Sequence, residues 1–157
     1  MALISLTADV PVHDPVIVKE GGVYYCFSTH GYFFRSPDLR SWKYGGKVLE
    51  TLPAWTRQAV PANDGQDWWA PELVYRDGSW RLYYAVSAFG KNTSAIGMAS
   101  TRTLDPASPD YGWEDRGPVF VSKATDPFNA IDPAVATDSE GRDWLLFGSF
   151  WGGLVML

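Results

Sequence analysis

The sequence contains few cysteines and histidines, and each shortage excludes a class of site. Among its 157 residues are one cysteine, Cys26, and two histidines, His13 and His30. A single cysteine excludes an internal disulfide and a multi-cysteine metal centre. Two histidines without clustered spacing do not predict a zinc site. Cys26 stands in the apolar run 23–27, so we expect it to be a small buried hydrophobe.

Positive charge and membrane-length apolar runs are also scarce. The 13 Lys and Arg residues are outnumbered by 18 Asp and Glu, and the net charge is −5. Nucleic acids and anionic membranes attract basic patches, so we expect neither as a partner. No apolar run approaches the ~20 residues of a membrane span. Residues 1–6 lack a basic n-region and are not expected to be a signal peptide, which leaves secreted and cytoplasmic locations open.

Aromatic residues, by contrast, are plentiful. They make up 15% of the chain and include 8 Trp, within a hydrophobic share of 46%. That share is enough for one globular domain with a real core. Aromatic enrichment is typical of β-structure and of stacking surfaces. Helical periodicity is essentially absent, so the sequence predicts an all-β fold.

One unit, opened by a proline, occurs three times. Its openings are Val-His-Asp-Pro at 12–15, Trp-Ala-Pro-Glu-Leu at 69–73 and Ala-Ile-Asp-Pro at 130–133. The prolines recur about every 60 residues, a period typical of propellers and arrays. Four short strands per repeat is the pattern of a propeller blade. We therefore predict a single partial β-propeller domain over 1–157, of about two and a half blades at 12–50, 69–122 and 130–157.

Each proline is expected at the start of the strand nearest the propeller axis. Proline lacks an N–H and so favours the first residue or the edge of a strand. The residue before it would then lie at the mouth of the central channel, where Asp14 and Asp132 stand in the first and third units. In the second unit Ala70 takes that place, and Glu72 follows on the same strand face. For each Asp alone the alternative is a turn cap, since Asp-Pro is a common turn dipeptide.

Six motifs, in order, resemble family 43 of the glycoside hydrolases. They are His-Asp-Pro at 13–15, the strand 22–29, Ser-Pro-Asp-Leu at 36–39 followed by Trp42, Trp-Ala-Pro-Glu at 69–72, Asn-Ala-Ile-Asp-Pro at 129–133 and Gly-Ser-Phe-Trp-Gly-Gly at 148–153. The family consists of five-bladed β-propellers that act on arabinose- and xylose-containing plant polysaccharides. The last two motifs are most like its arabinanases. The resemblance covers nearly the whole chain and implies arabinan, in preference to xylan, as the substrate.

The resemblance also implies an inverting mechanism with three acidic residues. Asp14 would be the general base, and Asp132 would raise the pKa of the acid and orient it. The acid, a glutamate of a later blade, has no counterpart here, nor does the histidine that helps to hold a central ion in many arabinanases. No cofactor is required, and a central calcium ion, although the resemblance suggests one, is not favoured for this chain. Glu72 is interpreted as a supporting or subsite residue, with a stand-in acid as the alternative.

Further residues beside these motifs are predicted to contact substrate. They are His13, Phe27, Trp69, Phe128, Asn129, Ile131, Ser149 and Trp151. Aromatic faces stack on the apolar faces of sugars, although blade packing is an alternative for each ring. For His13 a purely structural hydrogen bond is an equal alternative.

Three functions are compatible with these observations. The first is an arabinan hydrolase, active if an assembly supplies the missing acid. The second is a carbohydrate-binding half-propeller that lacks the acid, and the third is an inert folding fragment. Open blade faces and an unpaired sheet edge favour self-association into a dimer or larger homo-oligomer, because two copies would supply about five blades.

Overall fold

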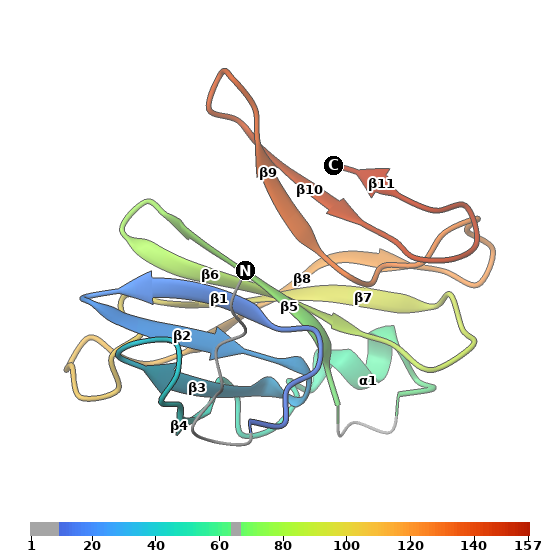
Figure 1. Cartoon of the computed structure of the whole chain (residues 1–157). Coiled ribbons are helices and arrows are strands. Elements are labelled where there is room, and N and C mark those ends of the chain that lie inside the picture. Colours follow the sequence, from blue (N-terminus) through green and yellow to red (C-terminus); the bar gives the residue numbers. More distant parts are fainter. Residues whose placement is uncertain (1–9, 64–66) are drawn as a thin grey trace.

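The computed structural model describes residues 10–63 and 67–157 and consists almost entirely of antiparallel sheet (Figure 1). The first sheet comprises β1 (Val16–Glu20), β2 (Val23–Phe27), β3 (Tyr32–Ser36) and β4 (Lys43–Lys47), with the 3₁₀ turn η1 (Thr29–Gly31) after β2. The second comprises β5 (Trp69–Arg76), β6 (Ser79–Val86), β7 (Ser94–Thr101) and β8 (Glu114–Ser122). The third comprises β9 (Ala134–Thr137), β10 (Asp143–Phe147) and β11 (Val155–Met156). The predicted all-β class is confirmed.

Each sheet is a meander in which consecutive strands are neighbours. The orders are β1-β2-β3-β4, β5-β6-β7-β8 and β9-β10-β11. This arrangement is that of propeller blades, two of them four-stranded and the third with three strands. One short helix, α1 (Trp55–Ala59), lies in the link between the first two sheets and was not predicted. The segment 1–6, which is not expected to be a signal peptide, lies outside the described residues.

Strand β5 begins at Trp69, earlier than the sequence suggested. Trp69 pairs with Ala85 and Glu72 pairs with Tyr83, with a shift of register between the two pairs. Pro71 falls inside this irregularity. A bulge tolerates proline because the regular ladder, which would need its N–H, is interrupted there.

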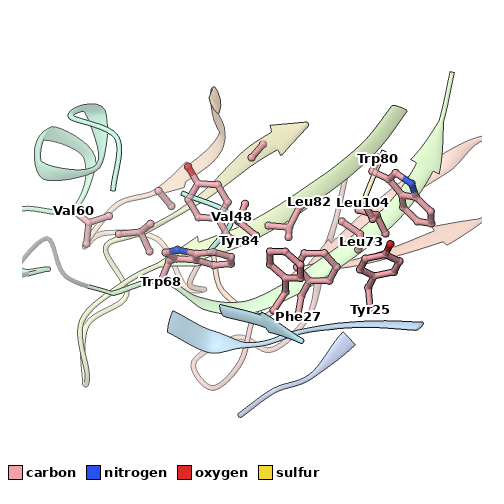
Figure 2. Close-up of a cluster of buried hydrophobic side chains, with 14 residues drawn as sticks. Tyr25, Phe27, Val48, Val60, Trp68, Leu73, Trp80, Leu82, Tyr84 and Leu104 are labelled. Carbon is pink, nitrogen blue, oxygen red and sulfur yellow. The ribbon is translucent and has the colours of Figure 1, made fainter. Parts of the chain in front are cut away.

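The main core lies between the first and second sheets (Figure 2). Rings from β2 and β3 pack there: Phe27 stacks on Phe33 with centroids 5.3 Å apart and meets the edge of Trp113 at 5.8 Å. A second cluster, formed by Ile96, Ala130, Leu145 and Phe147, joins the second sheet to the third. The blades are thus held face to face by apolar packing, the largest favourable contribution to such folds.

A carboxylate also joins the first two sheets. Glu20, at the end of β1, accepts hydrogen bonds from Trp80 Nε1 at 2.6 Å, Thr103 Oγ1 at 2.8 Å and the Leu104 N–H at 2.7 Å. Hydrogen bonds to a charged acceptor are among the stronger ones in proteins. Glu20 therefore fixes the position of the first blade against the second.

Cys26 lies in β2 and is 4% exposed. Burial raises the pKa of its thiol to about 11, so the thiol stays protonated at neutral pH. The prediction of a small buried hydrophobe is confirmed.

Candidate active site at the blade openings

The three blade openings share an unusual backbone conformation. Asp14, Ala70 and Asp132 each precede a proline, and their φ angles are +50°, +43° and +55°. Non-glycine residues adopt positive φ uncommonly, and local backbone strain of this kind clusters at functional sites. The conformation repeats in all three blades, so the openings are structurally equivalent. Two of them present a carboxylate.

Thr29 links the first opening to the second. Its Oγ1 donates to Oδ2 of Asp14 at 2.8 Å and accepts the Ala70 N–H at 2.9 Å. Its own N–H donates to the carbonyl of His13 at 3.0 Å. Thr29 is buried, whereas Asp14 is exposed. The hydroxyl therefore fixes one oxygen of a solvent-accessible carboxylate, as a residue that activates water requires. Thr29 is the last residue of the motif 22–29, but its contact with Asp14 was not predicted.

The charge of Asp14 affects the pKa of Asp132. Partial desolvation of its carboxyl raises the pKa of Asp132, the negative charge of Asp14 raises it further, and a hydrogen bond from Ser149 opposes both. Ser149 is in turn held by its N–H, which donates to Oδ1 of buried Asn129 at 2.8 Å. Asp132 is exposed as a residue, so these effects act on a carboxyl that water still reaches. The charge at the opening of the first blade therefore acts on the carboxyl at the opening of the third.

This raised pKa predicts a pH-dependent gain in stability on Asp132→Asn. At pH 7 the ionised carboxylate is disfavoured more in the folded than in the unfolded chain, and asparagine removes that penalty. Below the ordinary value of 3.8 the carboxyl is neutral in both states and the difference disappears. We therefore expect the variant to melt higher than the parent at pH 7 and at the same temperature near pH 3, as measured by thermal unfolding.

Asp138 offers a control of opposite sign. Hydrogen bonds from Trp144 and Arg142 lower its pKa to about 2, so its ionised form stabilises the folded chain. Asp138→Asn should therefore melt lower than the parent at pH 7, and the difference should shrink as the pH falls toward 2. A loss of stability for Asp132→Asn at pH 7 would contradict the electrostatic arrangement described here.

Glu72 lies between the second and third blades. It is half-buried, and its Oε1 accepts the Val135 N–H of β9 at 3.3 Å. Burial raises the pKa of Glu72, and hydrogen bonds from Val135 and Leu73 oppose the rise. Its pKa responds to burial and backbone contacts rather than to Asp14 or Asp132. This placement favours the supporting interpretation, and a role as acid remains a prediction.

Beside the openings lies an apolar hollow of about 350 Å³. Its lining includes Trp69, Phe89, Ile131, Phe150 and Trp151. Trp69, Ile131 and Trp151 were predicted substrate contacts, whereas Phe89 and Phe150 were not. Phe89 is 93% exposed and lies in the turn after β6, where none of the six motifs occurs. Phe150 lies within the motif 148–153. Exposed aromatic faces around a hollow are the surfaces on which sugar rings stack.

The remaining predicted contacts are placed differently. Phe27 is 1% exposed in the main core, so the prediction that it contacts substrate is wrong: no face of its ring is open to a ligand. Phe128 is half-buried, packs against Phe120 and Phe147, and stays a prediction. Asn129 is buried and borders the hollow. His13 is exposed beside Asp14, with its carbonyl bonded to Thr29.

Side chains that could ligate a metal ion do not gather in the described residues. Calcium takes six to eight oxygen ligands in proteins. Residues 10–63 and 67–157 contain no group of three His, Cys, Asp or Glu side chains that could hold a metal ion. Over the same residues, no helix is long and apolar enough to cross a bilayer.

The chain belongs to the glycosyl hydrolases family 43, whose family model matches residues 8–156. It is 49% identical, over 92% of its length, to the extracellular exo-α-(1→5)-L-arabinofuranosidase ArbA of Cellvibrio japonicus, of which it covers 42%. It is also 40% identical to the extracellular endo-α-(1→5)-L-arabinanase 1 of Bacillus subtilis. That alignment covers 91% of this chain and 45% of the relative. The chain therefore spans less than half the length of these curated relatives.

Solved structures give the same relation. The α-L-arabinanase of Cellvibrio cellulosa superposes with a TM-score of 0.90 at 48% identity, covering 94% of this chain and 48% of that one. A structure of the same enzyme complexed with arabinohexaose also gives a TM-score of 0.90, at 47% identity over 95% of this chain and 48% of that one. The fold is thus a partial propeller of the arabinanase type.

Proposed function

We propose that this chain forms the part of an arabinan-degrading glycosidase that carries the general base. The observation that supports this most directly is the pair Asp14 and Asp132: two carboxyls at equivalent strained openings, coupled in charge and adjacent to an aromatic-lined hollow. The relatives are named as arabinofuranosidase and arabinanase, which supports α-(1→5)-linked arabinose chains as the substrate class. Both are named extracellular, and we extend that location to this chain.

In the proposed mechanism Asp14 removes a proton from water as the water attacks the anomeric carbon. Thr29 orients the carboxylate through its hydrogen bond to Oδ2. A proton donor must stand on the other face of the sugar, roughly 6.5–9.5 Å from the base in inverting enzymes. Asp132 is placed to act on that donor by charge, since a neighbouring carboxylate keeps a carboxylic acid protonated at higher pH. The donor is a third carboxyl group, and Glu72 is the stand-in candidate among the described residues.

Release of reducing ends from debranched arabinan tests the proposal. Hydrolysis by this chain, strongly reduced in the Asp14→Asn variant, would support it. The second candidate function, saccharide binding without hydrolysis, is favoured by one observation: the aromatic rings of Trp69, Phe89 and Trp151 line the apolar hollow, and such rings stack on sugars. Binding of arabinohexaose by calorimetry with no release of reducing ends would establish that alternative.

We also infer that the open blade faces associate with a second copy of the chain. On β11 and beside it, Leu154 is 73% and Met156 59% exposed, and β11 pairs with β10 along one edge. Ile17, on the edge strand β1 of the first sheet, is 50% exposed. Exposed apolar side chains at an open sheet edge favour pairing with another chain.

Multi-angle light scattering is expected to give at least twice the mass of one chain. Met156→Lys, which places a charge on the edge strand, should shift the population toward the single-chain mass. Glu140→Lys, on the exposed turn between β9 and β10, changes charge away from that edge and should leave the mass distribution of the parent. A single-chain mass at all concentrations would contradict self-association and leave the proposed chemistry of Asp14 unaffected.

A further inference from the structure

Two loops of the third blade meet around Asp132. One is the segment 127–133 before β9, and the other is the segment 148–153 between β10 and β11. The Gly148 N–H donates to the carbonyl of Ile131, the residue before Asp132, at 2.8 Å. Gly148 has a φ of +109°, and a Cβ there would overlap a backbone oxygen of its own loop, so the position requires glycine. The loops are therefore held together next to Asp132.

A buried amide makes the second connection between these loops. Asn129 is 1% exposed, and its Oδ1 accepts the Ser149 N–H at 2.8 Å. The next residue, Ala130, donates its N–H to Oγ of buried Ser122 at the end of β8, at 3.0 Å. Buried polar groups of this kind are costly to leave without a partner, so each bond restrains the backbone that makes it. Ser149 is thus tied through Asn129 to a segment that is bonded to the second blade.

The Ser149 side chain reaches the carboxyl of Asp132. Partial burial and the charge of Asp14 both raise the pKa of Asp132, and the hydrogen bond from Ser149 lowers it. In the proposed mechanism Asp132 acts on the proton donor by its negative charge, so it must be ionised while the donor is not. A hydroxyl that donates to the ionised form favours that form. Ser149 therefore acts against the two influences that would protonate Asp132.

We propose that Ser149 is a positioning residue for Asp132: its hydroxyl orients the carboxylate and keeps it ionised, and the buried amide of Asn129 holds Ser149 in place. Both residues then influence the reaction through Asp132, as an alternative to the direct contact with substrate predicted from the sequence. The proposal rests on the proposed function, because Asp132 needs its charge only beside a proton donor. The contact itself exists without substrate and can be measured alone.

The titration of Asp132, followed by carboxyl ¹³C NMR of aspartate-labelled protein, tests the contact. The resonance that is missing from Asp132→Asn identifies the residue. Ser149→Ala removes the hydroxyl but keeps the backbone bond to Asn129, and should shift the titration midpoint of Asp132 to higher pH. Ser149→Thr retains a hydroxyl and should restore the midpoint toward that of the parent. Ser139→Ala, in the exposed turn between β9 and β10, is the matched control and should leave the midpoint unchanged.

A double-mutant cycle tests the part assigned to Asn129. Asn129→Leu is similar in size but lacks the acceptor for the Ser149 N–H, so it should also move the Asp132 midpoint upward. Combined with Ser149→Ala it should add no further shift, because residues that act through one contact are not additive. Unfolding temperatures show whether each variant is folded. If Asn129→Leu does not fold, the comparison of Ser149→Ala with Ser149→Thr still decides the role of Ser149.

The other outcomes overturn the proposal or a part of it. An unchanged midpoint in folded Ser149→Ala would exclude the contact with Asp132. Additive shifts in the cycle would show that Asn129 does not act through Ser149. In hydrolysis, Ser149→Ala should move the acid limb of the kcat profile to higher pH and leave KM unchanged, whereas a raised KM with an unmoved midpoint would assign Ser149 to substrate contact. A parent chain that hydrolyses no arabinan would contradict the proposed function, while the NMR midpoints would still decide the contact.

Discussion

Replacing Asp14 with asparagine is expected to lower the rate of arabinan hydrolysis by about 10²–10⁴-fold, the usual contribution of a general base. Asparagine keeps an oxygen for the Thr29 hydroxyl and tolerates the positive φ of this position, so the opening keeps its shape. The variant loses the ability to take a proton from water. Reducing-end release from debranched arabinan measures the effect, and unfolding temperatures should match those of the parent within a few degrees.

Rescue with azide distinguishes a base from a structural residue. In Asp14→Ala the azide anion attacks the anomeric carbon without needing deprotonation, a C–N bond forms as the glycosidic C–O bond breaks, and the leaving oxygen takes the proton of the acid. The expected product is a glycosyl azide of inverted configuration, formed faster than the variant hydrolyses arabinan. Full hydrolytic activity of Asp14→Ala, or a rate that azide does not change, would contradict the assignment of the base.

The blade openings could be predicted because their signals are local. A proline after Asp14 and Asp132 marks the start of the first strand of a blade, and the proline after Ala70 lies near the start of β5. The recurrence of those prolines then makes the positions equivalent by symmetry. What the pattern does not contain is the positive φ that all three adopt, since Asp and Ala are compatible with many backbone conformations.

The supporting residues could not be found in this way, because their roles depend on contacts between blades. Thr29 acts on Asp14 and Ala70, and Glu20 accepts hydrogen bonds from donors on two segments far along the chain. Asp67 and His30 lie on two separate loops, and their side chains come within hydrogen-bonding distance only after the sheets have packed. Residues whose role depends on contacts between blades do not recur with a fixed period or spacing, so a single sequence does not reveal them.

Two errors have simple physical causes. Helix α1 has five residues, too few for a 3.6-residue period to appear. Phe27 was assigned to substrate because it lies next to a motif, yet three consecutive residues of β2, Tyr25, Cys26 and Phe27, are all buried. β2 lies in the middle of its blade and is buried on both faces. Its sequence therefore lacks the alternation of apolar and polar residues that would distinguish core from surface positions.

That burial gives Phe27→Ala a large expected cost in stability. Removing a buried phenylalanine from a packed core typically costs about 3–5 kcal/mol, and Phe27 contacts the rings of both Phe33 and Trp113. Chemical denaturation should show this loss, and Phe27→Leu, which retains much of the volume, should lose less. The folded fraction of each variant should bind arabinohexaose as the parent does.

Trp151 is the matched comparison, because it is half exposed and borders the apolar hollow. Trp151→Ala should change the free energy of unfolding little and weaken sugar binding, the reverse of the Phe27 result, since its ring contributes to a ligand surface rather than to the core. A Phe27→Ala variant that keeps its stability but loses sugar affinity would return Phe27 to the binding surface and contradict the packing described here. The pair of variants therefore separates the two uses of aromatic residues in this chain, one in the interface between blades and one at the hollow beside Asp132.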